Sequence, residues 1–140
     1  TMLITMGGAS GVLFGNMFLA AAEELKEKDR ITVRDFAAME RRALMTVQKR
    51  GGAQKGDKTM IDALYPAVKA LEANVHKSLP EALRKAEEAA EQGMLNTKNM
   101  IARFGRGKFL VNRALGCQDA GATTIWLMFQ GMREYIEGTE

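Results

Sequence analysis

The chain has 140 residues, of which 46% are hydrophobic and 26% are charged, and 20 basic against 17 acidic residues give it a formal net charge of +3. These values are typical of one globular domain that buries a substantial core. The weak net charge, without an arginine-rich tract, argues against a nucleic-acid-binding protein. Cys117 is the single cysteine, which excludes an internal disulfide and favours a cytoplasmic location.

The first 22 residues carry no charge, and on a simple count they are long enough to span a membrane. The stretch also contains four glycines and several polar side chains, whose transfer into lipid would remove most of the apolar gain. The spacing of Gly11 and Gly15 suits close helix packing in a soluble protein equally well. We therefore expect no membrane segment and no signal peptide. The opening residues TMLIT resemble the tail of a longer element, so residues 1–140 are expected to form a single domain that is incomplete at its N-terminus.

Apolar residues at helical spacing predict a first helix from about Ser10 to Lys28. A capping box formed by Thr32 and Asp35 predicts the start of the next helix, which should end at Gly51. The residues of this helix that are expected to face inward are Val33, Phe36, Ala37, Leu44 and Val47.

A third helix is expected after the loop GGAQKGDKT, with either Asp57 or Thr59 as its N-terminal cap. Pro66 lies inside this helix and should kink it. The apolar residues that should form its buried stripe are Met60, Leu64, Ala67, Val68 and Leu71.

A second capping box, Ser78 with Glu81, predicts a fourth helix that Gly93 should end. A fifth helix is expected over residues 95–103, and a last one over residues 120–136 after a long irregular loop. Only the short stretch KFLV is compatible with a strand. The sequence therefore predicts an all-α protein of six helices with antiparallel neighbours.

Three glycine-bearing segments stand out: GGASG (7–11), RGGAQKGDKTM (50–60), and GRGKF with CQDAG (105–109 and 117–121). The first and third lead into predicted helix N-termini, where unpaired N–H groups and the helix dipole favour an anion. The same loops contain the basic residues Lys55, Lys58, Arg106 and Lys108. Each loop alone has a structural explanation, because glycine ends helices and lysine solvates loops, but their order and spacing favour a phosphate site.

The segments GGASGVLFGNMF, GDKTMIDALYPA and ARFGRGKFLVNRALGCQDAGATT closely resemble, in this order, the signature segments of the nucleotide-binding L subunit of dihydroxyacetone kinases. The resemblance covers residues 7 to about 132. It implies an antiparallel helical barrel or bundle with ADP or ATP at one end. It also implies phosphoryl transfer from the nucleotide to dihydroxyacetone, which a separate K subunit or domain holds. In one branch of the family, a phosphotransferase-system protein supplies the phosphoryl group.

The resemblance also assigns roles to individual residues. Ala9 and Ser10 would approach the nucleotide phosphates at a helix start, and Gly51 and Met60 would lie against the adenine. Arg106 would bind phosphate oxygens and is the candidate catalytic residue. The last loop would line the nucleotide with Asp119, Ala120 and Gly121.

Two departures from the family pattern indicate a divergent paralogue. The family segment G-H-x-D-P-G is replaced by GCQDAG, which removes an imidazole and a proline ring, and Asn112 stands where the family has an acidic residue. These changes remain compatible with the nucleotide pocket that the resemblance implies, but the acceptor could be another ketose or triose. A catalytically degenerate paralogue that serves as a nucleotide-binding or regulatory docking module is the alternative.

The family also holds two Mg²⁺ ions with three aspartates upstream of GGASG, whereas no acidic residue precedes Glu23 here. We therefore expect no metal ligand in this chain and Mg²⁺ only in an intact protein with an upstream aspartate motif. Asp57, Asp62 and Asp119 are expected to cap helices and anchor loops. The expected partners are the K subunit and a phosphotransferase-system donor, with neither nucleic acid nor membrane among them.

Overall fold

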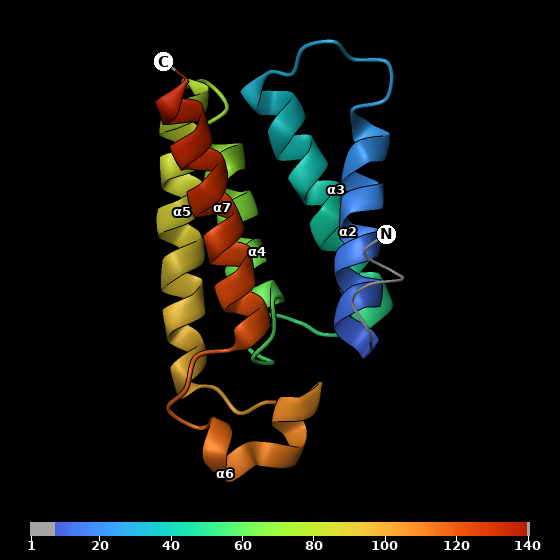
Figure 1. Ribbon diagram of the computed structural model, residues 1–140, viewed down its shortest axis with the longest axis vertical. Coiled ribbons are helices and arrows are strands. Elements are labelled where there is room, and N and C mark those ends of the chain that lie inside the picture. The colour runs from blue at the N-terminus through green and yellow to red at the C-terminus, as the bar shows by residue number, and fades with distance from the viewer. Residues whose placement is uncertain (1–7, 140) are drawn as a thin grey trace.

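The computed structural model describes residues 8–139, with the side chains of residues 8–10, 106, 107 and 111 left out. The long helices of this stretch are α2 (Gly8–Glu24), α3 (Val33–Gly51), α4 (Ile61–Ala73), α5 (Leu79–Asn96) and α7 (Ala120–Gly138) (Figure 1). The connection from α5 to α7 contains the 3₁₀ turns η1 (Thr97–Asn99) and η2 (Arg106–Leu110) and the short helix α6 (Val111–Ala114). The all-α class is confirmed, and the KFLV stretch is helical rather than extended.

Consecutive long helices run in opposite directions, as Figure 1 shows. Helices α2 and α3 form one hairpin and α4 and α5 a second, α7 packs against α5 and α4, and α3 joins the hairpins through its contact with α4. The starts of α2, α4 and α7, the ends of α3 and α5, and the short helix α6 all lie toward the lower end in Figure 1. We call this the glycine-loop end, because all three glycine-bearing segments lie there.

Both predicted capping boxes are confirmed. The Thr32 hydroxyl accepts a hydrogen bond from the Asp35 N–H at 3.1 Å, and the Asp35 carboxylate accepts one from the Thr32 N–H at 2.9 Å. Ser78 and Glu81 make the same reciprocal pair at the start of α5. The hydrogen bond from Lys28 and the bonds from Thr32 lower the pKa of Asp35 to about 2, so this cap carries its negative charge at the positive end of α3.

The predicted cap of the third helix is wrong for Asp57 but confirmed for Thr59. Met60 is the residue before α4 and makes no side-chain cap bond, whereas the Thr59 hydroxyl accepts a hydrogen bond from the N–H of Ile61, the first residue of α4, at 3.2 Å. In return, the carboxylate of Asp62, in the first turn, accepts hydrogen bonds from the N–H groups of Gly56 at 2.6 Å and Thr59 at 2.9 Å. The Asp57 carboxylate accepts one from the Gln54 N–H at 2.8 Å. Both aspartates therefore anchor the loop 52–60, as expected. They do so by accepting hydrogen bonds from N–H groups within the loop.

The predicted end of the fourth helix is also wrong, because α5 continues through Gly93 to Asn96. Gly93 is buried against α4, where a Cβ atom would lie 2.0 Å from the carbonyl oxygen of Asp62 and 2.9 Å from Cγ of Pro66. The glycine therefore allows two helix backbones to approach closely and does not stop a helix. The helix expected over residues 95–103 does not form as a separate element in the described chain, where α5 ends at Asn96 and is followed by the turn η1 and irregular backbone.

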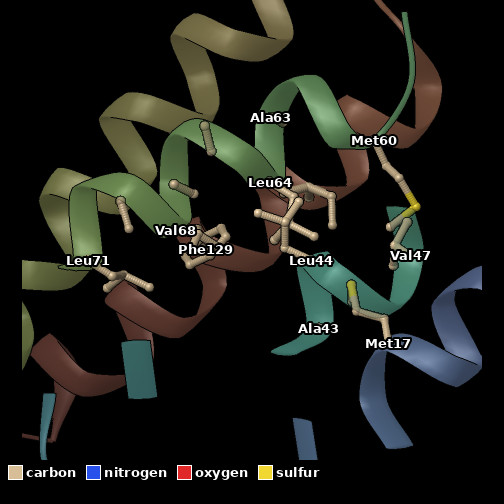
Figure 2. Close-up of a cluster of buried hydrophobic side chains, with 14 of the residues drawn as sticks. Met17, Ala43, Leu44, Val47, Met60, Ala63, Leu64, Val68, Leu71 and Phe129 are labelled. Carbon is tan, nitrogen blue, oxygen red and sulfur yellow. The ribbon is translucent and has the colours of Figure 1, made fainter. Parts of the chain in front are cut away.

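The inward faces predicted for α3 and α4 are confirmed, since all ten of those residues are buried. Figure 2 shows Leu44 of α3, Leu64 of α4 and Phe129 of α7 meeting in this core, with Met17 of α2 at its edge. Leu127 of α7 is apolar but 49% exposed, so it lies outside this core. None of the helices in the part of the chain that is described is both long and apolar enough to cross a bilayer.

The carboxyl group of Glu40 is buried beside this core. Glu40 is buried among the inward-facing residues of α3 and is only 8% exposed. Burial removes water from its carboxylate and raises the pKa of Glu40 to about 7. A neutral or partly ionised glutamic acid at this position couples the stability of the fold to pH.

Candidate functional site

The second glycine-bearing segment contacts α2 just beyond the first, at the end of α3. A Cβ atom on Gly51 would lie 3.3 Å from Cδ2 of Leu13, so the end of α3 packs closely against α2 one turn beyond Ala9 and Ser10. The side chains of Ala9 and Ser10 lie outside the described residues, but their backbone belongs to α2, which begins at Gly8 within GGASG. The first turn of this helix carries no acidic residue, so its positive end has no carboxylate of its own in that turn.

The second and third segments meet at Met60 and Gly121. A Cβ atom on Gly121 would lie 3.3 Å from Cβ of Met60 and 3.4 Å from its backbone nitrogen. Met60 is 5% exposed, and Figure 2 shows its thioether extending toward Val47 in the last turns of α3. Of the residues predicted to contact the nucleotide, Met60 and Gly121 are therefore direct neighbours, and Met60 reaches α3 about one turn from Gly51.

Asp119 is the N-cap residue of α7. Its carboxylate accepts a hydrogen bond from the Ala122 N–H at 2.8 Å, and its own N–H donates to the Thr97 hydroxyl at 2.8 Å. Burial raises the pKa of Asp119, and the bonds from the N–H groups of Ala122 and Gly121 oppose that rise. The start of α7 is thus occupied by a carboxylate of this chain, which leaves the start of α2 as the better place for a phosphate group. Ala120 is exposed beside it.

The four basic residues of the glycine-bearing loops differ in their surroundings. Lys58 is only 4% exposed, and its ammonium donates to the backbone carbonyls of Ala114 and Cys117, the latter at 2.7 Å. Lys55 lies over the ring of Tyr65, 5.4 Å from the ring centroid. Lys108 is exposed, and the side chain of Arg106 lies outside the described residues. Lys58 therefore binds protein carbonyls, a role that sequence reasoning missed.

Residues 104–113, which we call the basic loop, start and finish close to the loop 52–60. The Arg103 N–H donates to the Asp57 carbonyl at 3.3 Å, and the Arg103 guanidinium lies 3.6 Å from the Asp57 carboxylate. Farther along, the Gly116 N–H donates to the Lys98 carbonyl at 3.0 Å. These contacts join residues that are far apart in sequence, so no local sequence pattern predicts them.

The basic loop exposes apolar as well as charged groups. Phe109 is 85% exposed, and a depression of about 270 Å³ is lined by Phe109, Leu110, Asn112 and Arg113. Exposed aromatic and aliphatic side chains beside arginine are common where proteins bind partners. Asn112, which replaces an acidic residue of the family pattern, lies in this depression.

The carboxylates of the described residues do not assemble a metal centre. Between residues 8 and 139, no three or more side chains of His, Cys, Asp and Glu lie close enough together to hold a metal ion. Asp57, Asp62 and Asp119 all hold backbone N–H groups instead. Cys117 is exposed, and its thiol is 3.5 Å from the Arg113 carbonyl. The described residues therefore do not fit Mg²⁺ by themselves.

Comparison with known proteins gives consistent matches along the chain. Residues 1–134 match the family model of the DAK2 domain. Over 132 residues the chain is 39% identical to the ADP-binding subunit DhaL of the PEP-dependent dihydroxyacetone kinase of Escherichia coli. The aligned region covers 93% of this chain and 63% of that subunit. This chain thus spans less than two thirds of that relative.

Solved structures of the dihydroxyacetone kinase of C. freundii share the fold. The native form superposes with a TM-score of 0.69 at 31% identity, over 96% of this chain and 22% of that one. The complex of the same enzyme with AMP-PNP and Mg²⁺ gives a TM-score of 0.67 at 32% identity, over 95% of this chain and 21% of the other.

Proposed function

The chain belongs to the DAK2 domain family, and we propose that it is the ADP- or ATP-binding part of a dihydroxyacetone-type kinase. It would transfer a phosphoryl group from the bound nucleotide to dihydroxyacetone, or to a related ketose or triose, held by a separate K subunit. The observation that carries this proposal is that the three glycine-bearing segments lie at one end of the fold (Figure 1). The names of the relatives, one an ADP-binding subunit and one a kinase in complex with AMP-PNP and Mg²⁺, support it.

The proposed nucleotide lies across the glycine-loop end. The N–H groups at the start of α2, in the turn of Ala9 and Ser10, would bind phosphate oxygens. The contact between Met60 and Gly121, with Gly51 nearby, supports an apolar place for the adenine, since a thioether suits a flat aromatic ring. Asp119 and Ala120 would line the nucleotide from the start of α7. Arg106 would then bind the transferred phosphate as a charged fork.

The proposal also includes the partners of the reaction. A K subunit would dock over the basic loop, where exposed Phe109 and its neighbours offer apolar contact area. The PEP-dependence in the name of the Escherichia coli relative supports a phosphotransferase-system protein as the source of the phosphoryl group. Such a system would operate in the cytoplasm. Mg²⁺ would accompany the nucleotide through carboxylates other than the described ones.

Arg106→Ala should weaken ADP binding by about 30-fold, which corresponds to the loss of one charge-assisted contact of about 2 kcal/mol. Isothermal titration calorimetry with ADP measures this directly. Lys26→Ala is the matched control, because Lys26 is an exposed cation beyond the end of α2, and it should bind like the unchanged chain. Equal affinity of both variants would remove Arg106 from the site, and no heat of binding at millimolar ADP would refute the nucleotide proposal.

The stabilisation of this chain by ADP should depend little on Mg²⁺, because the described residues hold no cluster of metal ligands. Bound ligand stabilises a fold by an amount that grows with its concentration over its dissociation constant. Thermal melts with ADP, with and without Mg²⁺, should therefore give the same midpoint. A large additional shift with Mg²⁺ would show that this chain itself binds the metal. A chain that binds no ADP but still binds a K subunit would be a docking module instead.

A further inference from the structure

We propose that Lys58 is a positioning residue that holds the basic loop in place for phosphate binding, and that it is not itself a phosphate ligand. The inference rests on the nucleotide site proposed above and adds a residue that acts through another, Arg106. It follows from contacts that tie the two ends of the basic loop to two adjacent residues, Asp57 and Lys58.

Lys58 holds the C-terminal end of the basic loop. Its ammonium donates to the carbonyls of Ala114, the last residue of α6, and of Cys117, in the turn before α7. The side chain is almost completely buried. A buried ammonium is stable only where its charge and its N–H groups have partners, and these carbonyls provide them. The Lys58 ammonium is therefore already occupied.

Asp57 holds the N-terminal end of the same loop. Its carbonyl accepts from the Arg103 N–H, and its carboxylate lies beside the Arg103 guanidinium. The carboxylate also accepts from the Gln54 N–H at 2.8 Å, which fixes Asp57 within its own loop. Consecutive residues thus close the loop at both ends, as in a compact Ω-loop.

The backbone of Lys58 supports the same interpretation. Its φ angle is 59°, in the left-handed region that a residue with a Cβ atom seldom adopts. Such a conformation persists only where surrounding contacts hold it. The two hydrogen bonds from the Lys58 ammonium to the carbonyls of Ala114 and Cys117 are such contacts.

The position of Lys58 also connects the two parts of the proposed nucleotide site. Met60, two residues later, packs against Gly121 on the adenine side, while Lys58 fixes the segment that follows Arg106 on the phosphate side. Loss of the Lys58 ammonium should free the basic loop and leave the contact between Met60 and Gly121 in place. Binding of ADP should then weaken, whereas binding of adenosine, which has no phosphate, should not.

The test combines hydrogen exchange with calorimetry on Lys58→Met, which removes the ammonium and keeps the apolar stem. In the absence of nucleotide, the amides of residues 104–113 should exchange about tenfold faster, while those of α3 and α5 keep their rates. The dissociation constant for ADP should rise about tenfold and that for adenosine by less than about twofold, as expected when one charge-assisted phosphate contact is weakened.

Lys69→Met is the matched control, because it removes a half-exposed lysine on the outer face of α4. It should change neither loop exchange nor binding. In the Arg106→Ala background, Lys58→Met should have no further effect on ADP binding, because the two residues then act on the same contact. Additive losses, equal weakening of ADP and adenosine, or unchanged exchange in the basic loop would each overturn the proposal.

Failure of the proposed function and failure of the proposed role of Lys58 give different results in these experiments. If the unchanged chain binds no ADP, the proposed function fails, and the exchange rates alone decide whether Lys58 holds the loop. If Lys58→Met does not fold, Lys58→Arg replaces it, since this variant keeps the charge but alters the geometry of both bonds. Lys58→Arg should raise the exchange rates of residues 104–113 and the dissociation constant for ADP by smaller factors than those expected for Lys58→Met. If both quantities equal those of the unchanged chain, Lys58 contributes to folding alone.

Discussion

Replacement of Gly93 by alanine should lower the free energy of unfolding by about 3 kcal/mol, at the upper end of the usual cost of overpacking. The new methyl group would be placed 2.0 Å from the backbone carbonyl oxygen of Asp62, and no rotamer change can relieve a contact between a Cβ atom and a backbone atom. Helices α4 and α5 would have to move apart and lose part of the core between them. Urea unfolding followed by circular dichroism measures the loss.

Gly131→Ala is the matched control within the same fold. Gly131 lies inside α7, where a Cβ atom would meet nothing within 4 Å. Alanine there should raise the free energy of unfolding by roughly 0.5 to 1 kcal/mol, because it has the higher helix propensity. Two variants of equal stability would contradict the close approach of α4 and α5 at Gly93.

Glu40→Gln should stabilise the chain by about 3 kcal/mol at pH 9 and have little effect at pH 4, the size being set by the shift of its pKa. The pKa of Glu40 rises from 4.5 to about 7 on burial, so the folded chain favours the protonated carboxyl. The stabilisation from that preference is complete below pH 4.5 and is lost as the pH rises through 7. Glutamine keeps the shape of the side chain but never ionises.

Urea unfolding at a series of pH values from 4 to 9 tests this expectation. Glu88→Gln is the control, since the Glu88 side chain is 63% exposed and its replacement should change the unfolding free energy little at any pH. The difference between Glu40→Gln and the unchanged chain should grow between pH 5 and pH 8. A difference that stays constant across this range would show that Glu40 does not titrate within the fold.

The features that could be predicted from the sequence are those set by neighbouring residues. The capping boxes at Thr32 and Ser78 each join residues three apart, so the local pattern is enough to predict the starts of α3 and α5. The buried stripes of α3 and α4 follow from helical spacing in the same way. The order of the glycine-bearing segments, together with the family resemblance, likewise predicts that they lie at one end of the fold.

The features that could not be predicted depend on residues distant in sequence. Gly93 looks like a helix stop until the carbonyl of Asp62 and the ring of Pro66 are placed against it. Lys58 looks like a phosphate-binding lysine until Ala114 and Cys117 are brought over it. A glycine can end a helix or allow two helices to pack closely, and a lysine can bind a ligand or the carbonyls of its own chain. Only the residues that pack around them in the fold distinguish these roles.

The order of the helices along the chain bears on how the protein folds. Each hairpin joins neighbouring helices through a short connection, whereas α7 returns to α4 and α5 only after the long segment 97–119. Local contacts form sooner than distant ones, because less chain entropy is lost in closing them. The bonds of Lys58 join residues 56 and 59 positions apart, so they should form late. During refolding we therefore expect the helical signal to recover first and the proposed nucleotide binding to return in a later, slower phase.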